Sequence, residues 1–158
     1  MAIRTELLAP AGNLERLKWA VKYGADAVYF GLDAGFNARA RAANFPPQDL
    51  DAIVDFLHRR GVKGYVTLNT LAFTDELPQV ESLVRQIASA GVDAVLVQDL
   101  GVVRLIHAVA PALSVHASTQ MTLTSAECIA AVESLGIERV VLPRELSVPE
   151  IRAIHKQT

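Results

Sequence analysis

In the stretch Tyr23-Gly24-Ala25-Asp26-Ala27-Val28-Tyr29-Phe30, a glycine is followed closely by an apolar run of residues that favour β-strands. The arrangement decides the fold because it recurs at residues 60–68, 90–97 and 135–142. A glycine directly after a helix can adopt the left-handed conformation that closes the last helical turn. Each copy therefore predicts a junction where a helix ends and a strand begins.

Two further strands are predicted without this glycine, at residues 6–9 and at residues 113–117, the second of them after the helix breaker Pro111. Helical periodicity fills the intervals between strands, at residues 14–23, 48–60, 77–90, 100–109, 125–134 and 148–156. The sequence thus predicts six strands that alternate with six helices.

Start signals support these helices. Asn13 is suited to be an N-cap. Thr124-x-x-Glu127 and Ser147-x-x-Glu150 have the spacing of capping boxes. Helices are therefore expected to begin at these points.

The predicted strands are mostly continuous apolar runs, which is typical of parallel strands covered on both faces. The turn after the first strand, Ala9-Pro10-Ala11-Gly12-Asn13, lacks the glycines of a dinucleotide-binding turn. Polar residues instead follow strand after strand, as they do at the active-site end of a barrel. We therefore expect an α/β fold of parallel (β/α) units in an incomplete TIM-type barrel, with six of the eight strand-helix units.

Residues 1–158 are accordingly expected to be the N-terminal part of one (β/α)8 barrel domain, whose remaining units lie outside this chain. The hydrophobic content of 51% suffices for a single core. An open sheet leaves the first and sixth strands with unpaired edges, so self-association through these edges is expected.

Composition limits the classes of function. The net charge of −2 lacks the basic excess of an autonomous nucleic-acid-binding domain. No run approaches the roughly 18 apolar residues of a membrane span, so no membrane partner is expected. The single cysteine, Cys128, excludes a disulfide framework and fits a reducing, cytoplasmic setting.

Seven segments in order resemble the collagenase-like peptidase family, peptidase family U-32, and together cover essentially the whole chain. They are Leu7-Leu8-Ala9-Pro10-Ala11-Gly12-Asn13, residues 23–29, Asn37-Ala38-Arg39, Val66-Thr67-Leu68-Asn69-Thr70, residues 97–101, His116-Ala117-Ser118-Thr119-Gln120 and residues 142–146.

Within that family, segments 67–70, 98–99, 116–120 and 144–146 are most similar to the branch that hydroxylates a cytidine of large-subunit ribosomal RNA. The resemblance implies that structured RNA is the partner, that the route needs no oxygen, and that prephenate takes part. It also implies an iron–sulfur cluster in the full-length protein, held by cysteines beyond this region, because Cys128 matches none of them. Hydroxylation of a tRNA uridine or of the ubiquinone ring, proteolysis, and a non-catalytic binding module remain alternatives.

The candidate site residues follow the predicted strands. The catalytic candidates are His116, Asn69, Arg144 and Glu145, and the substrate-binding candidates are Asn37, Arg39, Gln98, Asp99, Ser118, Thr119 and Gln120. No metal site is predicted, since the remaining histidines have no partner at metal-ligand spacing. His116 and Ser118 share one face of a strand, which is the basis of the proteolytic alternative.

Several of these residues also have structural interpretations. His116 can be a hydrogen-bonded strand histidine, and Arg144 and Glu145 can pair with helix neighbours. Asp99, like Asn13, can cap a helix. Two pairs of residues on the long second loop also have two interpretations each. Phe36 and Phe45 can stack a base or pack the loop. Arg39 and Arg41 can bind a phosphate or carboxylate, or can be ordinary exposed arginines.

Overall fold

A computed structural model describes residues 5–38 and 43–158 of the chain. Arg39 and Arg41 lie outside the described residues. The strands are β1 (Leu8–Pro10), β2 (Ala27–Gly31), β3 (Lys63–Leu68), β4 (Ala94–Val97), β5 (Ser114–Ala117) and β6 (Ile137–Val140). The helices are α1 (Leu14–Lys22), α2 (Leu50–His58), α3 (Leu77–Ser89), α4 (Leu100–Val109), α5 (Ala126–Glu133) and α6 (Val148–His155).

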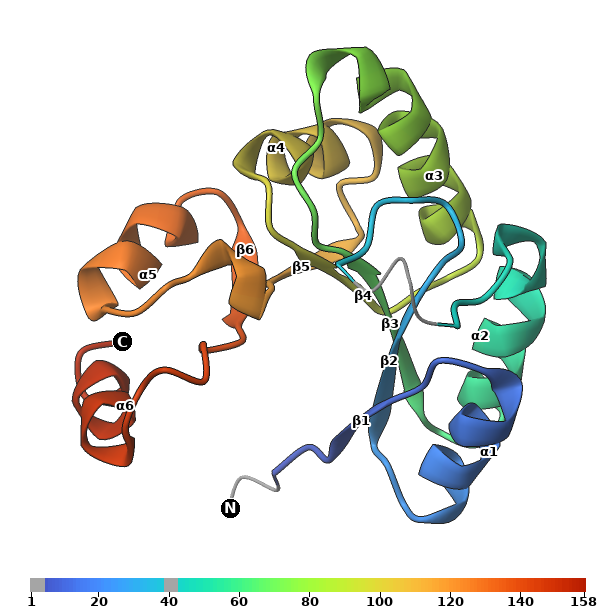
Figure 1. The fold of residues 1–158 in the computed structure, drawn as a ribbon, viewed down its shortest axis with the longest axis horizontal. Helices are drawn as coiled ribbons and strands as arrows, with labels where there is room; N and C mark the ends of the chain where they lie inside the picture. Colours follow the sequence, from blue (N-terminus) through green and yellow to red (C-terminus); the bar gives the residue numbers. More distant parts are fainter. Residues whose placement is uncertain (1–4, 39–42) are drawn as a thin grey trace.

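The six strands form one parallel sheet in the order β1-β2-β3-β4-β5-β6. The helices lie outside the curved sheet, and β1 and β6 are its two edges (Figure 1). Within the described residues the sheet does not close, because β1 pairs only with β2 and β6 only with β5. The predicted incomplete TIM-type barrel is confirmed.

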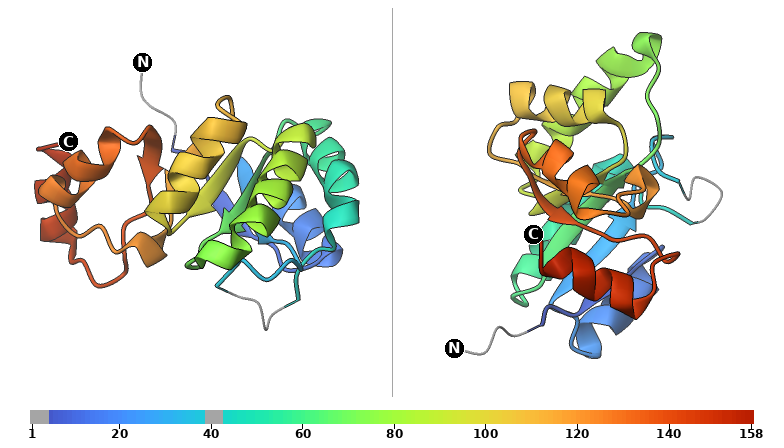
Figure 2. Two further views of the ribbon diagram at one scale, coloured as in Figure 1. Left: turned by 90° about the horizontal axis from the view of Figure 1, so that it is seen from above. Right: turned by 90° about the vertical axis from the view of Figure 1, so that its left-hand side faces the viewer.

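Side chains alternate between two apolar layers along each strand, as the two-residue period of a strand requires. Val28, Val66 and Val95 point outward into the main core beneath the helices. Tyr65 and Leu96 point inward into a smaller cluster in the barrel interior. The helices α1 to α4 pack as one group, whereas α5 and α6 stand apart at the β6 edge (Figure 2). The main core therefore lies beneath α1 to α4.

Most predicted helix ends agree with the structure to within one residue, and α4 agrees at both ends. The helix predicted from residue 48 instead begins with a 3-10 turn, Pro47–Asp49, before α2 starts at Leu50. In no helix of the described chain do length and hydropathy reach those of a membrane span.

The N-caps in the structure confirm two of the three predicted helix start signals and contradict the third. The side chain of Asn13 accepts the Arg16 N–H, which confirms its capping role. The Ser147–Glu150 capping box is also confirmed. The box predicted at Thr124 is wrong, because Ser125 is the N-cap and its hydroxyl accepts the Cys128 N–H.

The first strand starts at Leu8 rather than at the predicted Glu6. The Leu7 N–H donates to the carboxylate of Asp26 at 2.8 Å, so it is not available for regular pairing with β2. The Glu6 side chain reaches the barrel interior, where Tyr65 donates to both carboxylate oxygens at 3.1 Å.

An ion pair links the two edges of the open sheet. Arg139 on β6 pairs with Glu6, which lies two residues before β1, and the two residues are separated by 133 positions in the chain. The charge of Arg139 and its hydrogen bond, together with the bond from Tyr65, outweigh desolvation and lower the pKa of Glu6. The pair therefore holds β6 to the beginning of β1 although no backbone hydrogen bond joins these strands.

Arg139→Ala should lower the free energy of unfolding by about 1 kcal/mol, since the pair is charge-assisted but partly exposed. Amide hydrogen exchange should accelerate in β6 more than in β3. Arg85→Ala is the matched control, because it removes the exposed Arg85–Glu81 pair on α3 and should cost less than about 0.5 kcal/mol. Equal losses in the two variants would show that Glu6 and Arg139 do not hold the edges together.

Candidate active site at the carboxyl ends of the strands

A cavity of about 550 Å³ opens at the carboxyl ends of the strands. Its floor is apolar and includes Leu8, Leu96 and Val141. Six of the predicted site residues line it: Asn37, Asn69, Ser118, Thr119, Gln120 and Arg144. Parallel strands bring their carboxyl ends to one edge of the sheet, which is why residues so distant in sequence meet here.

Asn69 connects three parts of this wall. The Oδ1 atom of its side chain accepts the Ala38 N–H at 3.0 Å, and the Nδ2 atom of its side chain donates to the Ser118 hydroxyl at 3.1 Å. The loop after β2, the end of β3 and the end of β5 are thereby joined through one side chain. Asn69 lines the cavity and positions other groups there, and its catalytic role stays a prediction.

Gly31 supplies space for two asparagines at the end of β2. A Cβ atom on Gly31 would lie 2.5 Å from Asn44 Oδ1 and 3.0 Å from Asn37 Cγ, both shorter than normal contacts permit. Asn37 is buried, and its amide donates to the Leu32 carbonyl at 2.9 Å. The two asparagines therefore lie directly on the β2 backbone as part of the cavity wall.

The turn after β5 has an unusual backbone. Ser118 caps the 3-10 turn Thr119–Met121 by accepting the Gln120 N–H at 3.3 Å. Thr122 ends this turn at φ 57°, in the left-handed region that a β-branched residue rarely adopts. Such strain is common at binding and catalytic sites, and here it occurs at the end of the turn whose residues Thr119 and Gln120 line the cavity.

His116 lies deeper than predicted. It is 6% exposed, does not line the cavity, and packs edge-on against Tyr65 with ring centroids 5.0 Å apart. Burial, followed by the charge of Arg139, lowers the pKa of His116 to about 4, so its ring is neutral at neutral pH. Its position is that of a packed interior histidine beneath the site.

None of the other predicted residues that the structure describes lines the cavity. Asp99 caps α4 by accepting the N–H groups of Gly101 and Val102, and its second oxygen accepts the Ala72 N–H. Neither Gln98 nor Glu145 is among the described residues that line the cavity. Arg39 lies outside the described residues.

Sequence analysis missed several residues that line the cavity: Arg16, Tyr29, Gly31, Asn44 and Thr67. For Tyr29, Gly31 and Thr67 a signal existed, because they alternate with the outward-facing residues of β2 and β3. Phe36 and Phe45, by contrast, are buried, and Phe45 packs edge-on against Phe30 at 5.4 Å. They pack the loop.

A serine-protease arrangement is not formed. The Ser118 hydroxyl accepts two N–H groups, from Asn69 and from Gln120. Among the described residues no hydrogen bond joins Ser118 to His116, whose lowered pKa also makes it a weak base. A nucleophile needs a base within hydrogen-bonding reach.

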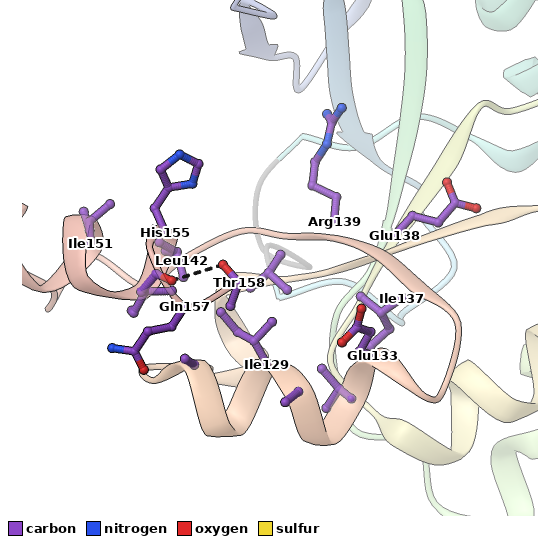
Figure 3. Close-up of a pocket in the computed structure, with 15 residues that line it drawn as sticks. Ile129, Glu133, Ile137, Glu138, Arg139, Leu142, Ile151, His155, Gln157 and Thr158 are labelled. Atoms are coloured by element: carbon purple, nitrogen blue, oxygen red, sulfur yellow. Dashed lines mark hydrogen bonds between the residues drawn. The ribbon is translucent and has the colours of Figure 1, made fainter.

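A second cavity, of about 570 Å³, lies between β6, α5 and α6 (Figure 3). Its apolar lining includes Ile129, Ile137 and Ile151, and Arg139 extends away from it toward the other strands. None of the predicted site residues lines it. We therefore place the candidate site in the first cavity.

The described residues do not fit an iron–sulfur cluster. Such clusters are held by several cysteine thiolates, whereas Cys128 is the only cysteine and lies exposed on α5. In the described parts of the chain no three His, Cys, Asp or Glu side chains are grouped as metal ligands.

Comparison with solved structures identifies the fold. The chain superimposes on a U32 peptidase with a TM-score of 0.77 at 21% identity, covering 98% of this chain and 66% of that one. It also matches deoxyribose phosphate aldolase from Aeropyrum pernix with a TM-score of 0.67 at 16% identity, covering 96% and 68%. At these identities the likeness concerns the fold alone.

Relatives in sequence are closer. The chain is 41% identical to the 23S rRNA 5-hydroxycytidine C2501 synthase of Escherichia coli K12, covering 98% of this chain and 23% of that protein. It is 38% identical to tRNA hydroxylation protein P1 of Bacillus subtilis 168, covering 98% and 36%. It is 36% identical to a protein of Porphyromonas gingivalis W83 named collagenase, covering 96% and 36%.

The chain thus spans about a quarter to a third of the length of these relatives. The family model for peptidase family U32 matches residues 12–158, which include all six helices, β2 to β6 and the six predicted site residues that line the cavity. This chain belongs to peptidase family U32.

Proposed function

We propose that this chain forms the base-binding part of an RNA-modifying enzyme that hydroxylates a pyrimidine, with a cytidine of 23S ribosomal RNA as the leading substrate. The observation that carries the proposal is the cavity at the carboxyl ends of the strands, which combines an aromatic ring, Tyr29, with amide and hydroxyl side chains. Unpaired bases are recognised by stacking and by hydrogen bonds to their edges. The relatives named for rRNA and tRNA hydroxylation support the same chemistry.

We assign the contact with the base edge to two side chains of the cavity wall, Thr119 and Gln120. Within the described residues the side chains of Thr119 and Gln120 form no hydrogen bond, while Asn69 and Ser118 are engaged in the wall. A glutamine amide both donates and accepts, which matches the amino and carbonyl groups of cytosine. Asn69 joins the loop after β2 to the end of β5 through its two hydrogen bonds.

The cavity must receive a base that has left its stack, because a ring carbon is not accessible inside structured RNA. Hydroxylation is a two-electron oxidation that needs an electron acceptor and an oxygen source, so we assign to this chain only binding and orientation of the base. We propose that an iron–sulfur cluster, if it serves the reaction, is held by cysteines outside residues 1–158. Prephenate stays a proposed co-reactant, with Arg39 and Arg41 as candidates for its carboxylates.

Asn69→Ala should reduce the modified fraction of the substrate nucleoside at least about tenfold, since it removes two hydrogen bonds worth about 1 kcal/mol each. The measurement is mass spectrometry of nucleosides from ribosomal and transfer RNA. It compares the source organism, a strain without the gene, and that strain complemented with wild-type or variant protein.

Thr70→Ala is a matched control next to Asn69, because Thr70 does not line the cavity. Loss of 5-hydroxycytidine in the deletion strain would support the rRNA assignment, and loss of a hydroxyuridine would move the substrate to tRNA. An unchanged nucleoside profile in the deletion strain would refute RNA hydroxylation.

A further inference from the structure

Two arginines line the cavity from the two edges of the open sheet. Arg16 belongs to α1, directly after β1, and Arg144 lies in the loop between β6 and α6. Both are exposed. They bring two guanidinium groups to the side of the cavity where β1 and β6 remain unpaired.

These arginines have no counter-charge in the cavity. None of the described residues that line it is an aspartate or a glutamate. Neither Arg16 nor Arg144 forms an ion pair within the described parts of the chain, whereas Arg59, Arg85 and Arg139 each pair with a carboxylate. The cavity therefore has a net positive lining.

The main chain around Arg16 leaves room for its guanidinium group. A Cβ atom on Gly12 would lie 3.0 Å from the Ala43 carbonyl oxygen and 3.8 Å from Arg16 Nη1. Arg16 Nη1 thus lies next to the turn after β1, although the side chain as a whole is exposed. A side chain at position 12 would narrow this space.

We propose that Arg16 and Arg144 bind an oxyanion carried by the occupant of the cavity, so that the site selects a nucleotide over a nucleoside. Planar guanidinium groups bind phosphate and carboxylate oxygens in pairs, and an unpaired cation in a concave site attracts such anions. A volume of about 550 Å³ lies within the range of small-molecule sites and accommodates a base together with its phosphate. The inference rests on the proposed binding of a base in this cavity, but its test distinguishes a failure of oxyanion binding from a failure of base binding.

Binding to the 158-residue chain can be measured by isothermal titration calorimetry. The probes are cytidine 5′-monophosphate, cytidine without a phosphate, ribose 5-phosphate without a base, and benzoate as a carboxylate. The variants are Arg16→Ala and Arg144→Ala. Arg152→Ala is the control, because Arg152 is exposed on α6, lies outside the cavity and changes the net charge equally.

We expect cytidine 5′-monophosphate to bind at least about tenfold more tightly than cytidine. Each of Arg16→Ala and Arg144→Ala should weaken the nucleotide about fivefold or more and leave cytidine unchanged, whereas Arg152→Ala should change neither. Displacement of the nucleotide by ribose 5-phosphate would assign the oxyanion to a phosphate. Displacement by benzoate alone would support the site and assign it to a carboxylate.

Equal affinity for the nucleotide and cytidine would overturn the inference while leaving base recognition intact. Unchanged nucleotide affinity in both arginine variants would also overturn it, as would the absence of binding by every probe. If the nucleotide and ribose 5-phosphate bind equally and cytidine does not bind, the oxyanion site stands and base recognition fails.

Discussion

Gly31→Ala is expected to lower the free energy of unfolding by about 2–3 kcal/mol, because the added methyl group overpacks the cavity wall at the end of β2. The added methyl group would lie 2.5 Å from Asn44 Oδ1 and 3.0 Å from Asn37 Cγ. Asn37 cannot swing away cheaply, because it is buried and donates to the Leu32 carbonyl. Urea unfolding of the wild-type chain and the variant measures the difference.

Gly64→Ala is the matched control in the next strand. Its nearest neighbours would be two apolar carbon atoms, Leu57 Cδ1 at 3.1 Å and Phe30 Cε1 at 3.6 Å, so no hydrogen-bonded side chain would have to move. We expect a loss below about 1 kcal/mol. If Gly31→Ala were as stable as Gly64→Ala, the asparagines would not be held against β2, and the described cavity wall would be wrong.

Acidification from pH 6.5 to pH 4 is expected to lower the free energy of unfolding by about 2–3 kcal/mol through His116. In the unfolded chain this ring takes up a proton near its ordinary pKa of 6.5, whereas in the fold burial and the charge of Arg139 lower the pKa to about 4. The unfolded state therefore binds more protons in this window, and stability falls as the pH falls. Glu138 and Glu6 oppose the shift, and Lys63 adds to it.

The measurement is urea unfolding at several pH values for the wild-type chain, His116→Gln and His155→Gln. His116→Gln should remove most of the dependence between pH 6.5 and pH 4. His155→Gln should retain it, because His155 is exposed on α6. Glu6, whose pKa is lowered, loses its contribution from its ordinary value of 4.5 downward, so it adds to the dependence only at the acid end of this window. A wild-type slope that survives in His116→Gln would contradict the buried, neutral histidine.

The order of strands and helices could be predicted because it depends on local signals. Glycines 24, 61, 91 and 136 all adopt positive φ at the junctions where the sequence placed them. The start of β1 could not be predicted, since it depends on the contact between Leu7 and the Asp26 carboxylate, 19 residues away. At the start of α5, Thr124 and Ser125 are both residue types that favour the N-cap position, and the sequence alone does not choose between them. In the structure the backbone places Ser125 at the N-cap.

The candidate site was predictable to the extent that parallel strands gather their carboxyl ends. Asn69 and Ser118 meet there because each follows its strand directly. His116 shares a face with Ser118 but precedes it by two residues, which places it roughly 6–7 Å deeper in the barrel. Arg16 and Asn44 were missed because they reach the cavity from a helix and a loop, where no strand period applies.

The central claim is that the cavity at the carboxyl ends of the strands receives a pyrimidine nucleotide. The most direct measurement is nuclear magnetic resonance of the ¹⁵N-labelled chain during titration with cytidine 5′-monophosphate. The account predicts that the largest amide shifts occur at Ala38, Asn69 and Gln120 around the cavity. Shifts confined to Ile129, Ile137 and Ile151 in the second cavity, or no shifts at all, would contradict it.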